Sequence, residues 1–308
     1  MSKEKTLKVS VCVVTYNQEK YIRQCLQSIV DQETDFDFEV IVGDDCSTDG
    51  TRAIVQEFAD KYPGLVKPIF YEKNIGVWKN YSTVHKSAKG EYVAHLDGDD
   101  YALPGKLQAQ VDVLDSHSNI SYTVHAVKVV DSERIIGNSE NLPEIATLND
   151  LLILGAYFAN SSMMYRRENQ FDHGEQDIVD FYLHIEHASK GDIYLIKKPL
   201  GVYRLHPGGI SSRKDYREMI ERCYESAFLR ALELGASPNI VKKGQLIRRK
   251  SFALRSLLDG EVDDYKKKIA LSIDDLQFAS FSHLVLFALS PLPITGLLAY
   301  LLRKKISR

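Results

Sequence analysis

Three aspartates, Asp97, Asp99 and Asp100, lie within four positions of one another, directly after a largely apolar run. Like charges this close repel, so a plain surface loop gains nothing from crowding them. Carboxylates do not attract bare phosphates, but they bind a divalent cation that in turn binds phosphates. Mg²⁺ and Mn²⁺ prefer oxygen ligands and are usually held by one or two carboxylates together with substrate phosphates. The spacing of Asp97 and Asp99 therefore predicts a metal ion that holds a diphosphate.

The elements that must position these acids follow from the pattern of the first hundred residues. Four segments begin as apolar strands: residues 8–17, 38–51, 65–76 and 91–96. Between them, apolar residues recur at helical spacing, as in residues 19–32, where Ile22, Leu26 and Ile29 share one face. Strands that alternate with helices at this spacing predict an α/β fold, with a mostly parallel sheet flanked by helices.

Polar residues of unusual type follow each of these four strands. They are Thr15, Tyr16 and Asn17 after the first, Asp44 and Asp45 after the second, Asn74 and Gly76 after the third, and the three aspartates after the fourth. In an open parallel sheet, ligands bind at the carboxyl ends of the strands. Asp and Asn are common in turns, but turns alone do not explain four such clusters on one edge. Neither GxGxxG nor GxxxxGK[ST] occurs, so no dinucleotide or phosphate-binding loop of those kinds is predicted.

Four segments, taken in order, carry a resemblance to a known family: "VSVCVVTYNQEKYIRQCLQSIVDQ", "VIVGDDCSTDGT", "NIGVWKNYSTVHKSAKGEYVAHLDGDD" and "GVYRLHPGGIS". They resemble the inverting family 2 glycosyltransferases of the GT-A fold, of the type found in bacterial polysaccharide and O-antigen assembly. A lone DxD triplet would be weak support, but the full ordered set is specific. The resemblance covers roughly residues 8–212. It implies a GT-A, Rossmann-like domain that binds a nucleotide-sugar.

The resemblance also implies roles for the strand-end residues. In the family, the residues after the first two strands line the nucleotide pocket. This implies contacts to base and ribose from Thr15, Tyr16, Asn17 and one or both of Asp44 and Asp45. A carboxylate that accepts from the base N–H would favour uracil. Asn74, Gly76 and Lys79 would border the same pocket. Asp97, Gly98 and Asp99 match the DxD motif, with Asp99 the first choice as direct metal ligand and Asp100 a supporting acid.

The catalytic base is expected elsewhere in the chain. Inverting transfer needs a carboxylate that takes the proton from the acceptor hydroxyl as it attacks the anomeric carbon. The family supplies an Asp at the head of a helix, and counting back from Gly191 aligns Asp180 with it. Here "VDF" replaces the more familiar "GDW". Asp177, one helical turn earlier, is the rival and Glu175 a further one, while both aspartates would also simply favour a helix N-terminus.

The segment "YRLH" follows a further expected strand. In the family, a similar segment closes over the diphosphate. This implies that His206 ligates the metal or hydrogen-bonds phosphate, and that Arg204 offsets negative charge. His95, between apolar neighbours on a strand, is interpreted as a core histidine, and so is His125. Ser161 lies on the acceptor side, either in contact with the acceptor or in a plain turn.

Two regions are expected along the chain. Residues 1–212 form the glycosyltransferase domain, with a nucleotide-binding half at 1–100 and an acceptor half at 101–212, and residues 213–308 form a helical C-terminal region. Residues 284–302 are uncharged and a basic end follows, which favours an interfacial anchor on an anionic cytoplasmic leaflet. The alternatives are a buried helical hairpin and a bilayer span, although two prolines and a glycine interrupt the apolar run.

The composition is that of a soluble globular protein, with 44% apolar and 26% charged residues. A formal net charge of -3 gives no reason to expect nucleic acid binding. The four cysteines are scattered without a CxxC pair, which argues against structural zinc or a disulfide framework and suits a reducing cytosol. The N-terminus lacks the apolar core of a signal peptide. We therefore expect a cytoplasmic protein, peripheral on the inner face of the cytoplasmic membrane.

The sequence as a whole predicts a metal-dependent inverting glycosyltransferase of the hexosyl- or N-acetylhexosaminyltransferase class. It would use Mn²⁺ or Mg²⁺, take its sugar from a UDP-linked donor and pass it to a hydroxyl of a glycan or lipid-linked glycan. A nucleotidyltransferase is one rival, but it would carry a Gly-rich basic loop where this chain has "TYNQEKYIRQ". A non-catalytic scaffold that binds a nucleotide-sugar is the other, and loss of the DxD acids or the base would favour it.

Overall fold

The computed structural model describes residues 7–172, 178–206, 216–271 and 280–290. The chain divides into two compact units, residues 1–148 with 156–223 and residues 149–155 with 224–308. The boundary predicted at residue 212 falls within residues 207–215, outside the described residues, and stays a prediction.

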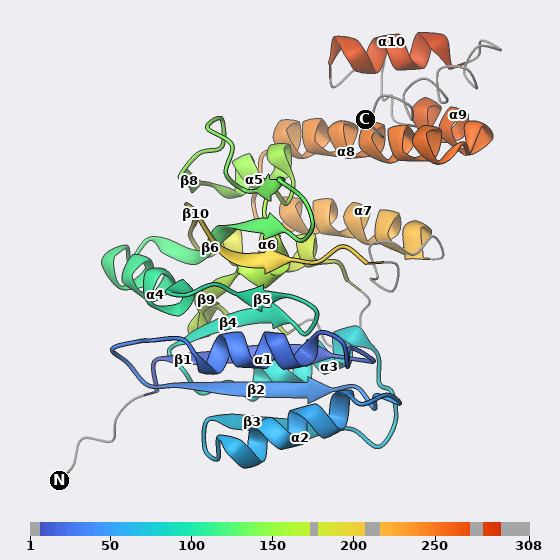
Figure 1. Cartoon of the computed structure of the whole chain (residues 1–308). Helices are drawn as coiled ribbons and strands as arrows, with labels where there is room; N and C mark the ends of the chain where they lie inside the picture. Colours follow the sequence, from blue (N-terminus) through green and yellow to red (C-terminus); the bar gives the residue numbers. More distant parts are fainter. Residues whose placement is uncertain (1–6, 173–177, 207–215, 272–279, 291–308) are drawn as a thin grey trace. The chain divides into compact units, whose positions relative to one another are not determined.

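The described strands of the first unit form one mixed sheet, shown in Figure 1. They are β1 (Val9–Thr15), β2 (Phe38–Asp44), β3 (Val66–Phe70), β4 (Tyr92–Asp97), β5 (Tyr101–Ala102), β6 (Ile120–Val129), β7 (Ile135–Ile136), β8 (Ile145–Ala146), β9 (Met164–Arg166) and β10 (Asp192–Tyr203). Their order is β3-β2-β1-β4-β9-β6-β10-β5, with β7 beside β6 and β8 beside β10. β1 to β4 pair in parallel, which confirms the predicted class, whereas β9 runs antiparallel to both β4 and β6.

Helices cover both faces of β1 and β2. The helical segments of this unit are α1 (Ile22–Val30), α2 (Thr51–Lys61), α3 (Val77–Lys86), α4 (Lys106–Ser116), α6 (Asp180–Ala188), η1 (Asn160–Ser162) and η2 (Arg167–Asn169). In Figure 1, α1 lies in front of β1 and β2 and α3 lies behind them. α1 buries Ile22, Cys25, Leu26 and Ile29, the face that its periodicity predicted. Every residue of β1 is buried, as expected for a parallel strand covered on both sides.

The second unit is helical. α5 (Leu148–Leu154) and α7 (Arg217–Glu233) straddle the division between the units, and α8 (Pro238–Asp259), α9 (Val262–Leu271) and α10 (Phe281–Leu289) follow. Leu257 of α8 and Tyr265 of α9 belong to its buried apolar cluster, and Glu225 pairs with Arg249 Nε at 2.8 Å. The predicted helical C-terminal region is therefore present.

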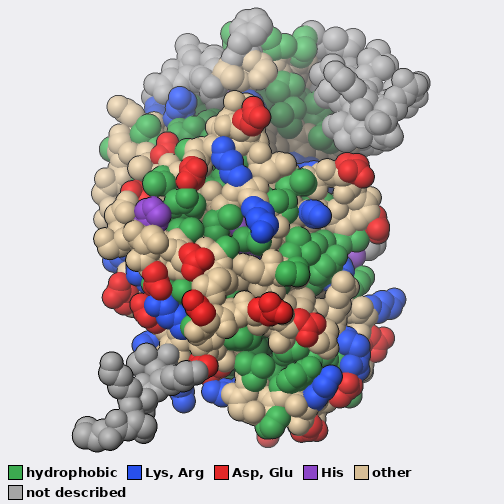
Figure 2. Space-filling model, turned by 60° about the vertical axis from the view of Figure 1, so that its left-hand side comes forward, with side chains coloured by type: hydrophobic (Ala, Val, Ile, Leu, Met, Phe, Trp, Pro, Cys, Tyr) green, Lys and Arg blue, Asp and Glu red, His purple; other side chains and the backbone are tan. Residues whose placement is uncertain are grey.

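Two features concern the possible partners of the protein: the charge of its surface and the apolar C-terminal segment. Figure 2 shows a face on whose described part acidic, basic and apolar side chains are interspersed, in keeping with the small net charge. Among the described residues, no helix is both long and apolar enough to cross a bilayer. Leu284 and Val285 of α10 are exposed. The rest of the predicted anchor, from residue 291 onward, lies outside the described residues.

Candidate active site

The ends of β1, β2 and β4 meet at one edge of the sheet. Thr15 pairs with Asp44 across β1 and β2, and Val14 pairs with Asp97 across β1 and β4. The backbone N–H of Gly98 also donates to the carbonyl oxygen of Val14, at 2.9 Å. The parallel register therefore places the acids after β2 and after β4 on either side of the end of β1, where ligands bind in open α/β sheets.

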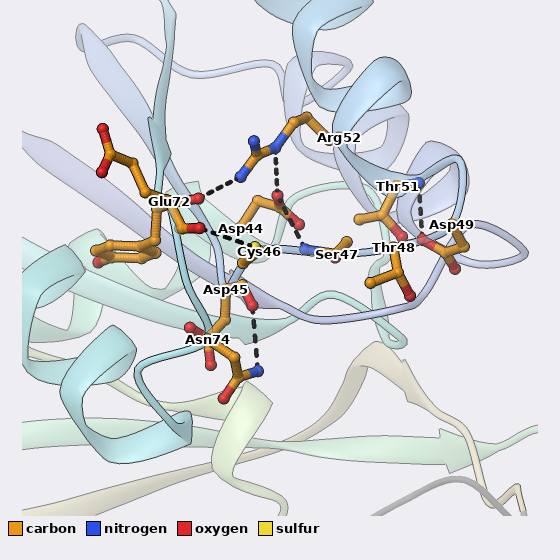
Figure 3. A network of polar contacts seen from close by, with 12 residues as sticks. Asp44, Asp45, Cys46, Ser47, Thr48, Asp49, Thr51, Arg52, Glu72 and Asn74 are labelled. Carbon is orange, nitrogen blue, oxygen red and sulfur yellow. Dashed lines mark hydrogen bonds and ion pairs between the residues drawn. The ribbon is translucent and has the colours of Figure 1, made fainter.

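Asp44 is fully buried at this edge, and Figure 3 shows how its charge is met. Arg52 Nε donates to Asp44 Oδ2 at 3.0 Å, and the same guanidinium donates to the carbonyl oxygen of Tyr71 at 2.6 Å. The backbone N–H of Ser47 approaches Asp44 Oδ2 at 3.4 Å. The other oxygen, Oδ1, has no hydrogen-bond partner among the described residues. A paired, buried carboxylate thus keeps one oxygen without a donor.

Asp45 holds the loop that follows β3. Its Oδ1 accepts from the backbone N–H of Ile75 at 2.7 Å and its Oδ2 from that of Gly76 at 3.0 Å. Asn74 Nδ2 donates to the carbonyl oxygen of Asp45 at 3.2 Å, as Figure 3 shows. Gly76 has a φ of 90°, which favours glycine. Lys79, further along the chain, is exposed on the first turn of α3. The predicted pocket residues after β2 and β3 are therefore joined by their own hydrogen bonds.

Of the three predicted pocket residues at the end of β1, two form hydrogen bonds that hold the loop and one is exposed. Thr15 is buried and donates from Oγ1 to Gln18 Oε1 at 2.7 Å. Asn17 has a φ of 52°, and its Oδ1 accepts from the backbone N–H of Thr48 at 2.8 Å. Tyr16 instead exposes 46% of its surface. Of these residues, Tyr16 is the one whose ring is open to a planar ligand, because the polar groups of the other two already hold the loop.

Asp97 is held from two sides. His95 Nε2 lies 3.2 Å from Asp97 Oδ1, while Ser161 Oγ donates to Asp97 Oδ2 at 2.9 Å and accepts from the Asp97 N–H at 3.1 Å. Burial works to raise the pKa of Asp97, but the charge and hydrogen bonds of His95, with that of Ser161, outweigh burial and lower the pKa. A Cβ added to Gly98 would lie 2.9 Å from Thr15 Cβ, so glycine permits this close approach of the two strand ends.

β10 returns the chain past the acids. β10 pairs antiparallel with β5, which begins directly after Asp100. The backbone N–H of Arg204 donates to Asp100 Oδ1 at 2.9 Å, and its guanidinium donates to the carbonyl oxygen of Asp99 and, at 2.5 Å, to Gln24 Oε1. His206 Nε2 lies 2.8 Å from Asp99 Oδ2. Arg204 and His206 therefore reach the aspartates from a strand far along the chain.

Direct ion pairs with lysine or arginine do not balance these aspartates in the described structure. Lys106 is buried nearby, and burial lowers its pKa to about 8, but its Nζ donates to the carbonyl oxygen of Ser161 at 2.7 Å. Burial raises the pKa of Asp99, and the charge of Asp97 adds to the rise. The pKa of Asp100 lies well above its usual range, through burial first and then through the other two aspartates. The cluster is short of positive charge.

The donor set suits a hard divalent cation. The three aspartates after β4 offer carboxylate oxygens, and one of these, Asp100 Oδ2, has no hydrogen-bond partner within the described structure. No three His, Cys, Asp or Glu side chains of the described residues are grouped so as to hold a metal ion by themselves. Mg²⁺ and Mn²⁺ commonly take one or two carboxylates and complete their shell with phosphate oxygens and water. The residues present therefore fit a cation that is bound together with a diphosphate.

Asp180 is the first residue of α6. Its surface is open to solvent, yet the surrounding protein removes enough hydration to raise its pKa to about 6, with the charge of Asp97 as the second cause. Asp180 is in turn the second cause, after burial, of the raised pKa of Tyr81. Asp180 therefore lies within electrostatic reach of the aspartate cluster. Its rivals Asp177 and Glu175 lie outside the described residues.

Two buried groups at this site were not assigned to it by the sequence analysis. Lys106 gave no signal, because lysine is rarely buried. His95 is buried, as interpreted, but its ring contacts Asp97, and that contact was available from the strand period, since residues i and i+2 share a face. Ser161, for which an acceptor contact or a turn was left open, lies in η1 and hydrogen-bonds Asp97, and the acceptor contact stays a prediction. His125 does fit its interpretation, with its Nδ1 2.9 Å from a backbone carbonyl.

Comparisons with known proteins match both the sequence and the fold. The family model described as "Glycosyl transferase family 2" matches residues 10–170. An uncharacterized protein of Mycobacterium tuberculosis (strain ATCC 25618 / H37Rv) is 37% identical over 222 residues, 69% of this chain and 64% of that protein. The chain therefore spans less than two thirds of that relative. The poly(ribitol-phosphate) beta-N-acetylglucosaminyltransferase TarS of Staphylococcus aureus (strain MW2) is 34% identical over 164 residues, 52% of this chain and 28% of that protein.

Solved structures extend the match along the chain. The crystal structure of S. aureus TarS 1-349 in complex with UDP-GlcNAc has a TM-score of 0.70 at 23% identity, covering 96% of this chain and 89% of that chain. The mannosyltransferase PcManGT from Pyrobaculum calidifontis, in complex with GDP-Man and Mn²⁺, has a TM-score of 0.60 at 18% identity, covering 96% and 86%. At these identities the likeness shows the fold, and the predicted GT-A architecture is confirmed.

Proposed function

Because the chain belongs to glycosyl transferase family 2, we propose that it transfers a sugar from a nucleoside diphosphate donor to a hydroxyl of a glycan or lipid-linked glycan. The observation that carries this proposal is the aspartate cluster after β4, which is short of positive charge and lies beside the end of β1. A diphosphate with its cation supplies the charge that this cluster lacks. Inversion at the anomeric carbon is part of the proposal and rests on the family.

The nucleoside would lie along the ends of β1 and β2. The ring of Tyr16 offers an exposed apolar face for a base. The carboxylates of Asp44 and Asp45 would accept from the base N–H, which favours uracil, and Asp44 Oδ1 has no donor within the described structure. The loop of Asn74, Gly76 and Lys79 would close the far side of this pocket. UDP-GlcNAc in the TarS complex supports UDP as the nucleotide, whereas PcManGT binds GDP-Man.

The diphosphate would lie over the second cluster. Asp97 and Asp99, with His206, would hold Mn²⁺ or Mg²⁺, which when bound neutralises charge on the leaving diphosphate as a Lewis acid. Mn²⁺ in the PcManGT complex supports this choice. The Arg204 guanidinium is set between the rings of Tyr21 and Tyr101, 5.1 and 4.8 Å from their centroids, which fixes a positive charge beside the cation site.

The proton of the acceptor hydroxyl would go to Asp180. A carboxylate with a pKa of about 6 is largely ionised at pH 7 and is a stronger base than an ordinary aspartate. Donor and acceptor held in one geometry would supply much of the remaining rate. The acceptor would reach the site on a lipid or polysaccharide at the inner face of the cytoplasmic membrane. Exposed Leu284 and Val285 of α10 support a peripheral contact of the second unit with that membrane.

The first test is a calorimetric titration of UDP and of GDP into the purified chain, with Mn²⁺ and with chelator. We expect tight UDP binding that needs Mn²⁺ and disappears in Asp99→Ala, while Asp60→Ala, an exposed aspartate of α2, binds as the wild type does. Binding of GDP in place of UDP would change the donor. Metal-independent binding, or no binding of either nucleotide, would remove the basis of the proposal.

A further inference from the structure

A series of hydrogen bonds leads from the buried interior of the sheet to Asp97. Tyr165 OH lies 2.8 Å from His85 Nδ1, and His85 Nε2 lies 3.1 Å from His95 Nδ1. His95 Nε2 then lies 3.2 Å from Asp97 Oδ1. We propose that His95, oriented by His85 and Tyr165, is a positioning residue that fixes the Asp97 carboxylate for the cation and the diphosphate. The inference rests on the proposed function, because it assigns a role within the same site.

The carboxylate fixes the proton of His95 on Nε2, and for neutral rings it also sets the direction of the other two hydrogen bonds. Ionised Asp97 accepts only, so His95 must carry its proton on Nε2. In a neutral ring Nδ1 is then an acceptor, and His85 must donate to it from Nε2. His85 Nδ1 is left as an acceptor in its turn, and it takes the hydroxyl proton of Tyr165. With both rings neutral, each ring carries its proton on Nε2, and each donor points toward Asp97.

Packing keeps these rings from turning. His95, His85 and Tyr165 are all buried. The Tyr81 ring stacks on His85, with centroids 3.8 Å apart and planes 17° apart, and it also contacts His95 at 5.0 Å. A ring pinned in this way holds its N–H in one place, and partners behind a metal-binding group act in this manner by orienting it.

The other oxygen of Asp97 is held by an unrelated part of the chain. Ser161 Oγ donates to Asp97 Oδ2, and Lys106 Nζ donates to the carbonyl oxygen of Ser161. Rotation of the Asp97 carboxylate would therefore break a hydrogen bond on each side. Burying two histidines costs more than burying apolar side chains of similar size. The orientation of Asp97 gives a reason for polar groups at these two core positions.

The test compares His95→Leu, His95→Gln and His125→Leu in the full chain by calorimetric titration of UDP with Mn²⁺. His125 is the matched control, because it is equally buried and bonds a backbone carbonyl away from Asp97. We expect His95→Leu to weaken Mn²⁺-dependent UDP binding by about 10–100-fold, the usual effect of losing such a partner. Gln places an amide N–H near the position of the histidine Nε2–H, so His95→Gln should recover most of the affinity.

Two further variants should give a graded series. His85→Leu leaves His95 without the donor that fixes its tautomer, so its loss of affinity should be smaller than that of His95→Leu. Tyr165→Phe removes one hydroxyl at the far end of the series, so its loss should be smaller still. Equal affinity of His95→Leu and His125→Leu, with both folded by circular dichroism, would overturn the positioning role.

The tautomers can be read directly in the metal-free protein. Long-range ¹H–¹⁵N spectra of the histidine rings should show a proton on Nε2 of both His85 and His95, and the His85→Leu variant should show a fraction of His95 rings that lack it. A His95 ring without a proton on Nε2 in the wild type would overturn the inference, because it could not donate to Asp97. If the wild type bound no UDP while these tautomers were found, the proposed function would fail and the hydrogen-bonded series would stand.

Discussion

The two strands that flank β1 both end in aspartates: Asp44 ends β2 and Asp45 follows it, while Asp97 ends β4 and Asp99 and Asp100 follow. The first pair finds its partners within the fold: the guanidinium of Arg52 for Asp44, and two backbone N–H groups of one loop for Asp45. The second group includes two aspartates whose pKa is raised by burial and by their neighbours.

This difference in partners indicates a different kind of ligand for each aspartate cluster. Carboxylates that fixed donors hold in place form a rigid wall, which suits the proposed recognition of a nucleoside, and Asp44 Oδ1 has no donor among the described residues. Carboxylates that repel one another in a partly buried site are stabilised when a cation binds, so their unmatched charge is a driving force for metal binding. The aspartates of both clusters look alike in sequence, and only their partners tell them apart.

The largest expected difference between the two aspartate clusters is in kcat/KM. Asp99→Asn should lower kcat/KM for UDP release from a UDP-sugar by about 10⁴-fold, because a bound cation contributes several kcal/mol to the transition state. Asp45→Asn should lower it only about tenfold, because one weakened hydrogen bond to the Ile75–Gly76 backbone loosens the loop and raises KM for the donor. Steady-state kinetics measure both, and equal losses would erase the distinction between the clusters.

The next effect is on pH dependence, because Asp97 of the second cluster acts on Asp180. The raised pKa of about 6 means that Asp180, the proposed base, is protonated below that pH and can then no longer accept a proton. The rate of UDP release should therefore fall about tenfold per pH unit below about 6, and Asp180→Asn should lower the rate by about 10²–10⁴-fold and leave it flat with pH. A variant that kept both the rate and the acid limb would move the base elsewhere, with Asp177 the next residue to change.

Loss of a partner from the first cluster, Asp44 and Asp45, should lower the stability of the protein. Arg52→Leu leaves the buried Asp44 carboxylate without its guanidinium, and we expect a loss of about 2 kcal/mol in the free energy of unfolding. The matched control is Arg23→Leu, which breaks an exposed ion pair with Glu57 at 2.6 Å and should cost much less, because solvent screens that pair. Urea denaturation measures both, and the same small cost for each variant would show that Asp44 does not depend on Arg52.

The second cluster should respond in the opposite direction, by the smallest amount. Asp100→Asn removes a repelling charge and keeps an oxygen that accepts from the Arg204 N–H, so the metal-free protein should gain about 1 kcal/mol at pH 8. The folded pKa is raised, so the folded state holds its proton more tightly than the unfolded chain does. Stability therefore falls as pH rises from about 4 through that folded pKa, and the gain should vanish at the acid end. A loss of stability at pH 8 would contradict the account of unmatched charge.

The sequence was sufficient for the parts of the fold that depend on local pattern. Apolar runs that end in polar residues located β1, β2, β3 and β4, and parallel pairing then required their ends to meet at one edge. The same reasoning placed "YRLH" after a strand, and β10 ends at Tyr203, directly before Arg204. Periodicity also gave the buried face of α1.

The contacts that distinguish the two aspartate clusters could not be predicted from the sequence. Arg52 lies on a helix like many exposed arginines, and its sequence gives no sign that it reaches back to Asp44. Ser161 bonds Asp97 from a 3₁₀ segment whose position depends on β9, a strand of three residues that runs against its neighbours. Such contacts are fixed by tertiary packing between distant segments, which no local propensity encodes.

The placement of β9 has a consequence for how the protein is made. As the chain emerges from the ribosome, β1 to β4 can pair before β9 exists, and β4 then presents an uncovered edge. β9 closes that edge from one side and joins β6 on the other, and Ser161, which holds Asp97, lies just ahead of it in the chain. The ends of β1 and β2 can thus form early in synthesis, whereas the aspartates after β4, the proposed metal ligands, acquire their final geometry only when β9 docks. On the proposed assignment, a nascent chain halted before β9 would therefore hold the residues for the base in place before those for the diphosphate.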